Sequence, residues 1–320
     1  MVSRKDVAIA AGVSQATVTN VYNRVKYVSP EIRAKVLQAA LEVGYQDVST
    51  MEFVLLVKDA DNPYNGMILS GMKEAAMRYG AEASMVLVDN DADRIVDALI
   101  KRKVAGIFSA ISEDAIDQKM RTSLENSGVG FSSSWEDFQI DFQEAIDQMV
   151  SYLFGMGHSR IAYLSGIPMQ GSGNIRFAGF CSAIEKIGGT IHKELLIDGV
   201  FPYTTDVDSG YQAMKKLIDS GEKFTAVYAV NDLMALGAVR ALREAGLNIP
   251  ADVSVVGCDN IRLGEYANPP LTTLDVSARE MGRQIVYTLL QKSSGSDTQK
   301  IHIVPQLIVR KSTGQAKKID

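Results

Sequence analysis

Cysteine and histidine, the residues that most often build disulfide frameworks and metal centres, are scarce in this sequence. Its 320 residues include two cysteines, Cys181 and Cys258, and three histidines that lie far apart. Cysteines so widely separated give neither a disulfide framework nor a metal-binding spacing. No apolar run approaches the roughly 18 residues of a membrane span, and the N-terminus shows no secretory signal. We therefore expect a protein of the reducing cytoplasm with no metal and no cofactor.

Positive charge is in deficit over the whole chain but in excess at its beginning. The formal net charge is −5, from 33 Lys and Arg against 38 Asp and Glu. Residues 1–45 hold six basic and three acidic side chains, or +3, so the remaining residues carry −8. A small basic head on an acidic body fits contact with phosphates by the head alone. The length predicts two or three soluble domains.

Residues 3–23 predict a helix-turn-helix. Ser3, with Asp6 three residues later, can cap a first helix, which Gly12 ends. Ser14 can cap a second helix. A third helix is expected from Ser29-Pro30-Glu31 to Gly44, and the three helices would close a head. Apolar residues recur at helical spacing in the first two helices: Val7, Ala10 and Ala11, then Val18, Val21 and Tyr22.

The other side of the second helix carries short or amide side chains, namely Gln15, Ala16, Thr19, Asn20 and Asn23. Gln and Asn can each form a bidentate pair with adenine, and Ala can contact a thymine methyl group. A small polar helix behind a tight turn is typical of a recognition helix that enters the DNA major groove.

From residue 53 the pattern changes to strands that alternate with helices. Phe53–Val57 is a continuous apolar run, as expected for a strand buried on both faces. Such repeated units predict an α/β fold with two doubly wound parallel-sheet lobes and a cleft at the strand carboxyl ends. We expect strands at 53–57, 83–88, 104–108, 129–133, 160–164, 194–197, 225–229, 253–256 and 301–309, and helices at 66–79, 91–102, 114–126, 143–156, 174–187, 207–220, 231–245 and 277–292. The tail after Arg310 is expected to fray.

With the head and the doubled body in view, the chain resembles transcriptional regulators of the lactose/galactose repressor (LacI/GalR) family. The motifs that carry the resemblance cover nearly the whole chain in order. They are DVAIAAGVSQATVTNVYN and VSPEIRAKVLQAALEVGY in the head, DADNPYNGMILSGMKEAA after the first strand, and then GMGHSRIAYLSG, RFAGF, AVNDLMALGAVRALREAGLNIPADVSVVGCDN, NPPLTTLD and LIVRKSTG.

The resemblance implies a helix-turn-helix head at 1–45, a short linker at 46–52 and a periplasmic-binding-protein-like core at 53–320. The implied N-lobe comprises about 53–157 and 277–300, and the implied C-lobe about 158–274 and 301–313. It also implies a homodimer or higher oligomer that binds double-stranded operator DNA and a small-molecule effector, usually a sugar.

The linker departs from the family pattern. Members normally carry a Pro-Asn-x-x-Ala-Arg type stretch that becomes a hinge helix and inserts an apolar wedge into the minor groove. Here only Gln46–Glu52 separates Tyr45 from Phe53, and Asp47 and Glu52 would repel phosphate. We therefore do not predict minor-groove insertion.

Carried over residue by residue, the resemblance assigns DNA contacts within the head. The implied base-reading residues are Gln15, Ala16 and Asn20. The residues placed to meet phosphates, which set register rather than sequence, are Lys5, Ser14, Thr17, Thr19, Asn23, Tyr27 and Ser29. For each phosphate contact, a helix cap or a solvated face is the structural alternative.

The effector site implied by the resemblance is polar with an aromatic wall. Arg176 matches the family's ligand-binding arginine, whose planar fork suits paired hydroxyls or a carboxylate. Asn231 can cap a helix as well as touch a ligand, and Trp135 can stack on a sugar or fill a core. The full set is Asp59, Tyr64, Asn65, Trp135, Asp141, Arg176, Phe201, Asn231 and Asp259.

These features predict a ligand-responsive DNA-binding repressor, most simply of carbohydrate genes, with a sugar or sugar phosphate as effector. No nucleophile elbow, P-loop or metal cluster competes with this interpretation. Three alternatives remain: a small-molecule sensor with weak DNA binding, suggested by the short linker; a sugar enzyme, which lacks an acid/base pair; and a nucleobase or nucleoside as effector. His158 in GMGHS is expected to cap or pack.

Overall fold

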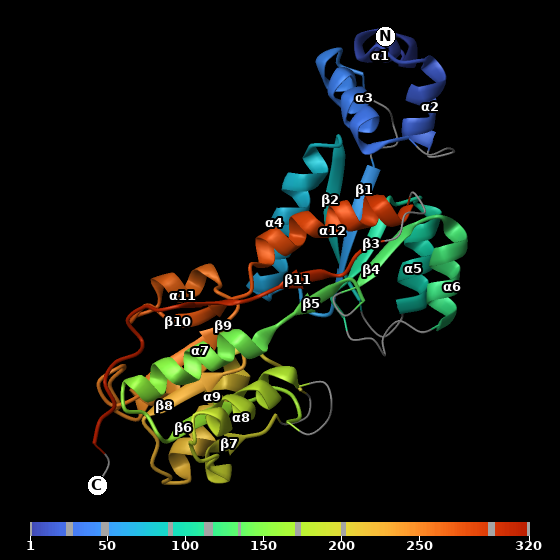
Figure 1. Cartoon of the computed structure of the whole chain (residues 1–320). Helices are drawn as coiled ribbons and strands as arrows, with labels where there is room; N and C mark the ends of the chain where they lie inside the picture. Colours follow the sequence, from blue (N-terminus) through green and yellow to red (C-terminus); the bar gives the residue numbers. More distant parts are fainter. Residues whose placement is uncertain are drawn as a thin grey trace. The chain divides into compact units, whose positions relative to one another are not determined.

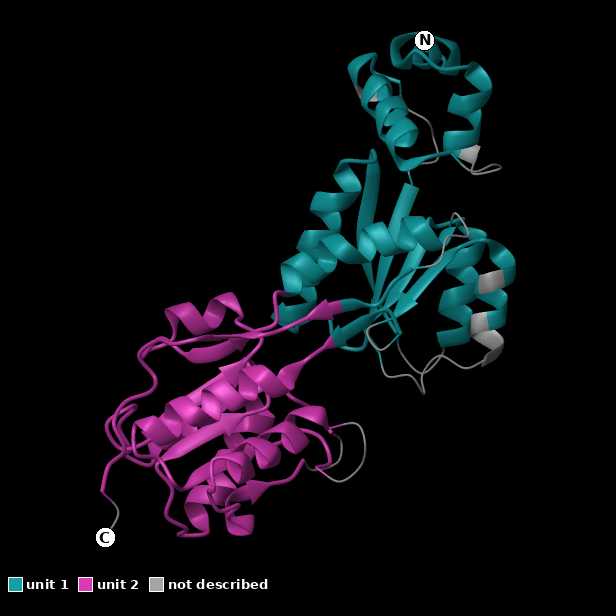
Figure 2. Cartoon of the chain, in the orientation of Figure 1, with its two compact units in different colours: residues 1–139, 278–301 teal, residues 140–277, 302–320 magenta. Residues whose placement is uncertain are grey.

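The chain forms two compact units in the computed structural model (Figure 2). Unit 1 comprises residues 1–139 and 278–301, and unit 2 comprises 140–277 and 302–320. Among the helices described, none has the length and apolar character needed to span a bilayer. The structure describes residues 2–23, 28–45, 51–88, 92–111, 118–133, 136–169, 174–199, 203–293 and 298–318.

The N-terminal head begins unit 1 with helices α1 (Arg4–Ala11), α2 (Gln15–Asn23) and α3 (Pro30–Glu42). Asp6 accepts hydrogen bonds from the Ser3 hydroxyl (2.7 Å) and the Ser3 backbone N–H (2.8 Å), which lower the pKa of its carboxyl. Gly12 ends α1 with φ +61°, a conformation that glycine adopts without strain. The head core is Val7, Ala8, Ala11, Val18, Val21, Val36, Leu37, Ala39 and Ala40. Ala10 is exposed, so the apolar stripe includes Ala8 in its place.

The rest of unit 1 is a parallel sheet in the order β2-β1-β3-β4. Its strands are β1 (Met51–Val57), β2 (Ala81–Leu87), β3 (Gly106–Ser109) and β4 (Gly130–Ser133). Val54 and Leu56 of β1 pack with α5 (Ala92–Lys101) and α6 (Gln118–Ser127). The helices α4 (Pro63–Met77) and α12 (Ala278–Ser293) cross closely, because a Cβ on Gly71 would lie 1.9 Å from the Arg279 carbonyl oxygen.

Unit 2 is a six-stranded sheet in the order β12-β10-β9-β8-β6-β7, parallel except for β12 (Figure 1). Its strands are β6 (Ile161–Leu164), β7 (Leu196–Ile197), β8 (Ala226–Ala229), β9 (Ser254–Cys258), β10 (Thr272–Asp275) and β12 (Gln306–Ile308). Helix α7 (Phe142–Gly155) packs with α8 (Ile175–Lys186), and α9 (Val207–Asp219) packs with α10 (Asp232–Glu244). The short helices η2 (Lys193–Leu195) and α11 (Arg262–Tyr266) complete the unit.

Three boundaries differ from the sequence prediction. The first crossing between units lies after residue 139 rather than 157, because α7 packs against α8 in unit 2. The linker ends before residue 51, since Met51 and Glu52 already pair with β2. The predicted strand 301–309 is two strands, β11 (Ile301–Ile303), which pairs with β5 (Phe138–Ile140), and β12. Pro305, which has no N–H to donate, separates them.

The charge of Glu52 is also compensated within unit 1. Its carboxylate accepts hydrogen bonds from the Arg102 guanidinium at 2.6 and 2.8 Å, and from the Ser84 hydroxyl at 2.6 Å. The negative charge of Glu52 is therefore already paired with Arg102, and the expected repulsion between Glu52 and DNA phosphate stays a prediction.

The C-terminal segment 310–317 is ordered, so the prediction that it frays is wrong. The Ser312 carbonyl accepts from Val255 N at 2.8 Å, and the Ser312 hydroxyl donates to the Val255 carbonyl at 2.6 Å. His158 is 1% exposed; its Nε2 lies 2.9 Å from the Gly314 carbonyl oxygen, and burial lowers the pKa of its imidazole. The predicted packing role of His158 is confirmed, because it joins β6 to the end of the chain.

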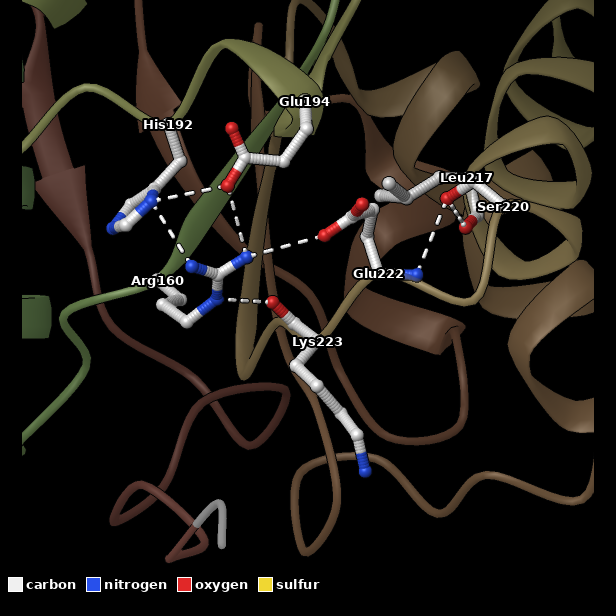
Figure 3. Close-up of polar contacts among 7 residues, drawn as sticks. All are labelled: Arg160, His192, Glu194, Leu217, Ser220, Glu222 and Lys223. Carbon is white, nitrogen blue, oxygen red and sulfur yellow. Dashed lines mark hydrogen bonds and ion pairs between the residues drawn. The ribbon is translucent and has the colours of Figure 1, made fainter.

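Arg160 precedes β6 at the amino edge of the same sheet. Its side chain bonds the segments that lead into the two neighbouring strands, β7 and β8 (Figure 3). Its guanidinium donates to the Lys223 carbonyl at 2.5 Å and to Glu194 at 3.1 Å, and it lies 3.0 Å from His192 Nδ1. Glu222 completes the cluster at 3.5 Å. These residues precede β6, β7 and β8, so the cluster aligns the starts of three strands and leaves the carboxyl edge for other roles.

Candidate functional site

Helix α2 separates its side chains into a buried and an exposed face. Val18 is fully buried and Val21 is 1% exposed, whereas Gln15 and Ala16 are exposed and Asn20 is half-buried. The three predicted base-reading residues therefore lie on the side of α2 that faces away from the head core. A Gln and an Asn in these positions can each present an amide to a base edge.

Several predicted phosphate contacts also have a structural role. The Ser14 hydroxyl accepts from Thr17 N at 3.0 Å and lies 2.8 Å from the Thr17 hydroxyl, so it caps α2. The Ser29 hydroxyl accepts from Ile32 N at 3.4 Å at the start of α3. Lys5 is exposed on α1 and Thr19 is half-buried on α2. Capping is established for the two serines, and phosphate contact stays a prediction for these five residues, Thr17 included.

In unit 1 the predicted effector residues lie in and just after the loop that follows β1. Asn65 donates through its amide nitrogen to the Asp59 carbonyl at 2.8 Å, and the Asp59 carboxylate accepts from Asp61 N at 2.8 Å. The Tyr64 hydroxyl lies 3.6 Å from the sulfur of Met281 on α12. Asn65 therefore fixes the loop that carries Asp59, a role that the sequence did not indicate.

In unit 2, Arg176 and Asp259 form the electrostatic centre of the predicted site. The Arg176 guanidinium donates to the Val230 carbonyl at 3.0 Å and lies 5.4 Å from the ring centre of Phe142. Asp259 is 8% exposed; burial raises the pKa of its carboxyl to about 7, although Arg176 opposes the rise. Burial lowers the pKa of Arg176, but Cys258 and Asp259 outweigh it and raise the pKa overall. A permanent cation is thus coupled electrostatically to a carboxyl whose pKa burial raises to about 7.

Asn231 and Asp141 both cap helices. Asn231 is 5% exposed; its Oδ1 accepts from Met234 N at 2.9 Å, and its Nδ2 donates to the Thr205 carbonyl at 2.9 Å. Asp141 is exposed, and its Oδ1 accepts from Gln143 N at 3.1 Å. The capping alternative is therefore correct for Asn231, and Asp141 likewise starts α7; ligand contact stays a prediction for both.

Sequence comparison matches the head and the core to two different family models. Residues 4–47 match the family described as bacterial regulatory proteins, lacI family, and residues 150–313 match the periplasmic binding protein-like domain. The HTH-type transcriptional repressor PurR of Histophilus somni strain 129Pt is 30% identical over 98% of this chain and 99% of its own length. The chain belongs to the LacI family.

Solved structures of LacI-family regulators share the fold of this chain. A complex of the transcriptional regulator CelR with cellobiose superposes with a TM-score of 0.70 at 27% identity, and covers 98% of this chain and 100% of its own. A lac repressor dimer bound to operator and the anti-inducer ONPF gives a TM-score of 0.66 at 27% identity, with 98% and 99% coverage. The predicted fold and family are confirmed: the protein is a LacI-family transcriptional repressor with a DNA-binding helix-turn-helix head.

Some predicted contacts of this LacI-family protein lie outside the described residues. Tyr27, Trp135 and Phe201 are among them, as is the side chain of Asn23. The aromatic wall predicted from Trp135 and Phe201 therefore stays a prediction.

Sequence reasoning missed three buried hydroxyls that lack a hydrogen-bond partner within the described part of the chain. They belong to Ser109 at the end of β3, Ser132 in β4 and Tyr228 in β8. An unpaired buried hydroxyl is unfavourable and is a reasonable place to look for a missing ligand contact. Ser109 and Tyr228 sit in strands with otherwise apolar neighbours, and the sequence pattern held no signal that their hydroxyls would be unpaired.

Proposed function

We propose that this LacI-family repressor binds operator DNA as a homodimer and that a sugar-type effector, held by unit 2, shifts its operator affinity. The effector favours one conformation of the protein, and its differential affinity changes the population that is competent to bind DNA. Because a repressor must reach DNA, we place it in the cytoplasm. The regulated genes are proposed to serve carbohydrate uptake or metabolism.

The exposed face of α2 supports the DNA-binding half of the proposal. Gln15, Ala16 and Asn20 lie on that face, whereas the hydrophobic residues of α2 are used for the head core. The similar lac repressor structure is a dimer bound to operator. Two heads of a dimer would then read two half-sites of a near-palindromic operator.

The electrostatic coupling of Arg176 with Asp259 is the observation that carries the effector half. A guanidinium has five N–H donors; that of Arg176 bonds the Val230 carbonyl and also has Cys258 as a hydrogen-bond partner. Asp259, which is electrostatically coupled to Arg176, supplies acceptor oxygens. One strong donor group and one strong acceptor group suit a ligand with adjacent hydroxyls, each of which both donates and accepts. The similar CelR structure holds cellobiose, a ligand of this class.

Selection of random duplex DNA on the purified protein, repeated across salt concentrations, tests the DNA-binding half. A two-fold symmetric enriched site is expected, and its half-site spacing would show how the heads are placed by so short a linker. Weak, salt-sensitive binding without an enriched sequence would instead favour a small-molecule sensor.

The effector half is tested on the enriched site with cellobiose, ribose, glucose 6-phosphate and adenosine. We expect one of the sugars to change the dissociation constant for DNA, and we expect the change to weaken below about pH 7 as Asp259 gains a proton. A response to adenosine alone would contradict the sugar class and favour a nucleoside effector.

A further inference from the structure

The predicted effector ligand Asp259 lies in a turn with an unusual backbone. Asp259 has φ +109° and the next residue, Asn260, has φ +54°. Positive φ is unfavourable for residues with a side chain, and φ near +109° is a conformation that mainly glycine adopts. Such a turn between β9 and α11 persists only when the surrounding structure holds it in place.

The buried carboxyl of Asp232 is attached directly to this turn. Asp232 is fully buried at the first residue of α10. Its Oδ2 accepts from Ile261 N at 2.8 Å, and its Oδ1 accepts from the Thr273 hydroxyl at 2.6 Å. A Cβ on Gly257 would lie 2.1 Å from Oδ1, so glycine at this point of β9 makes room for the carboxyl.

Thr273 joins the same turn from β10. Its hydroxyl oxygen accepts from Asn260 N at 3.3 Å while its proton goes to Asp232. Asp259 N donates to the Leu274 carbonyl at 2.8 Å. All three backbone N–H groups from 259 to 261 therefore end on the carboxyl of Asp232 or on β10.

The side chain of Asn260 is held as well. The Arg310 guanidinium donates to Asn260 Oδ1 at 2.6 Å and to the Leu271 carbonyl at 2.8 Å. The ordered C-terminal segment thus provides a third contact to the turn, besides those of Asp232 and Thr273. The contacts of Asp232, Thr273 and Arg310 leave little freedom for the backbone that presents Asp259.

Burial of the Asp232 carboxyl at this position is energetically unfavourable. Burial raises the pKa of its carboxyl to about 8; the hydrogen bond from Thr273 opposes the rise, and the nearby Asp259 adds to it. A buried carboxyl is unfavourable unless a specific arrangement requires it. The only visible use for both of its oxygens, within the described residues, is to hold the turn and β10 together.

We propose that Asp232 and Thr273 are positioning residues for the effector site, which fix the Asp259–Ile261 turn so that the Asp259 carboxyl faces a ligand. This inference rests on the proposed effector role of Asp259. The two residues act through Asp259 and make no contact with the effector themselves.

Substitution of Thr273 tests the inference, because Thr273→Val removes only the hydroxyl and keeps the side-chain shape. The neighbouring Thr272 gives a matched control: it is equally buried, and its hydroxyl bonds Thr313 and Arg310 N in place of the turn. Thr272→Val should therefore cost similar stability while the hydrogen bonds from the backbone of residues 259–261 to Asp232 and β10 stay in place. Thr273→Ser restores the hydroxyl.

Two readouts are made on the full-length variants: amide hydrogen exchange over residues 259–261, and binding of cellobiose, with ribose as second probe. In Thr273→Val we expect exchange to rise and sugar binding to weaken by about tenfold each, as for loss of one or two buried hydrogen bonds. Thr272→Val and Thr273→Ser should change neither by more than about twofold.

Equal exchange in Thr273→Val and Thr272→Val would overturn the positioning role, whatever happens to sugar binding. Asp259→Ala separates this result from a failure of the proposed function. If Asp259→Ala leaves sugar binding unchanged while Thr273→Val frees the turn, the turn is positioned as inferred and the effector assignment of Asp259 is wrong. If Asp259→Ala abolishes binding and Thr273→Val changes neither readout, the positioning inference is wrong.

Discussion

In the head, folding and proposed DNA contact depend on different residues, whereas in unit 2 the same residues serve the fold and the proposed ligand contacts. In α2 the core is made by Val18 and Val21, and the residues proposed to read DNA lie on the opposite face. In unit 2, Asn231 caps a helix and Arg176 bonds a backbone carbonyl, so these two proposed ligand contacts also support the fold. Mutations in the head should therefore separate function from stability, whereas mutations in unit 2 need controls that match the structural loss.

Arg176→Gln should produce the largest effect. It removes the forked cation but keeps a polar side chain, and we expect effector affinity to fall by about 100-fold, as for loss of a buried charged hydrogen-bond partner. Operator affinity without effector should not change. Calorimetric titration and DNA-binding assays measure the two quantities.

Arg160→Gln is the control for Arg176→Gln, since Arg160 also donates to a backbone carbonyl but lies at the amino edge of the sheet. The two variants should lose comparable stability and differ in effector binding. A similar loss of effector affinity in both would show that Arg176 acts only through the fold.

The second largest difference between the two regions should be the pH dependence of their stability. In unit 2, burial raises the pKa of Asp232 to about 8 and of Asp259 to about 7, so the folded unit binds protons that the unfolded chain has released above about pH 4. The free energy of unfolding of unit 2 should then fall as pH rises from about 4 to 8, by up to about 1.4 kcal/mol per pH unit and carboxyl. In the head, hydrogen bonds from Ser3 lower the pKa of Asp6. The stability that the Asp6 carboxylate contributes should therefore be lost as pH falls, which is the opposite of the trend expected for unit 2.

Denaturant titrations across this pH range, followed by hydrogen exchange to resolve the regions, check the prediction. Asp232→Asn and Asp259→Asn should each flatten the profile of unit 2. A profile of unit 2 that rises with pH between 5 and 8 is incompatible with two carboxyls of raised pKa.

Asn20→Ala should have a smaller effect that is confined to DNA. We expect operator binding to weaken by about 1–3 kcal/mol and the preference at one base pair to relax, with the melting temperature nearly unchanged. Repeating the DNA selection with the variant measures this. Gln38→Ala on α3, which removes an exposed amide bonded to Glu42, is the control and should leave the preferred sequence intact. An unchanged preference in Asn20→Ala would refute the assignment of α2.

Tyr228→Phe should have the smallest effect, and its sign is the informative part. The Tyr228 hydroxyl is buried without a partner, so its removal should raise the free energy of unfolding by about 1 kcal/mol. Tyr152→Phe removes a hydroxyl that lies 2.8 Å from the Thr313 hydroxyl and should lower stability. If both variants lose stability, the Tyr228 hydroxyl has a partner in solution.

The sequence predicted the elements whose signals are local. Caps at Ser3 and Ser14, the break at Gly12 and the strand–helix alternation all depend on neighbours within a few residues, and the structure has them. The first crossing between units was misplaced because the partner of α7 is α8, which lies some 20 residues later and leaves no local mark.

The chemistry of the site was less predictable than its residues. Family resemblance supplied Arg176 and Asp259, and Asp232 escaped attention because its partners Ile261 and Thr273 are distant in sequence. The order of the C-terminal segment was missed for the same reason: polar residues such as Ser312 and Thr313 suggest a loose tail until their partners in β9 and β10 are known.

The C-terminal segment also sets the order in which the newly made chain can fold. The head is local in sequence and can form as soon as residues 1–45 are synthesised, whereas the sheet of unit 2 is complete only once β12 and Ser312 have been made. Each nascent chain therefore carries a complete helix-turn-helix head before the sheet of unit 2 is complete.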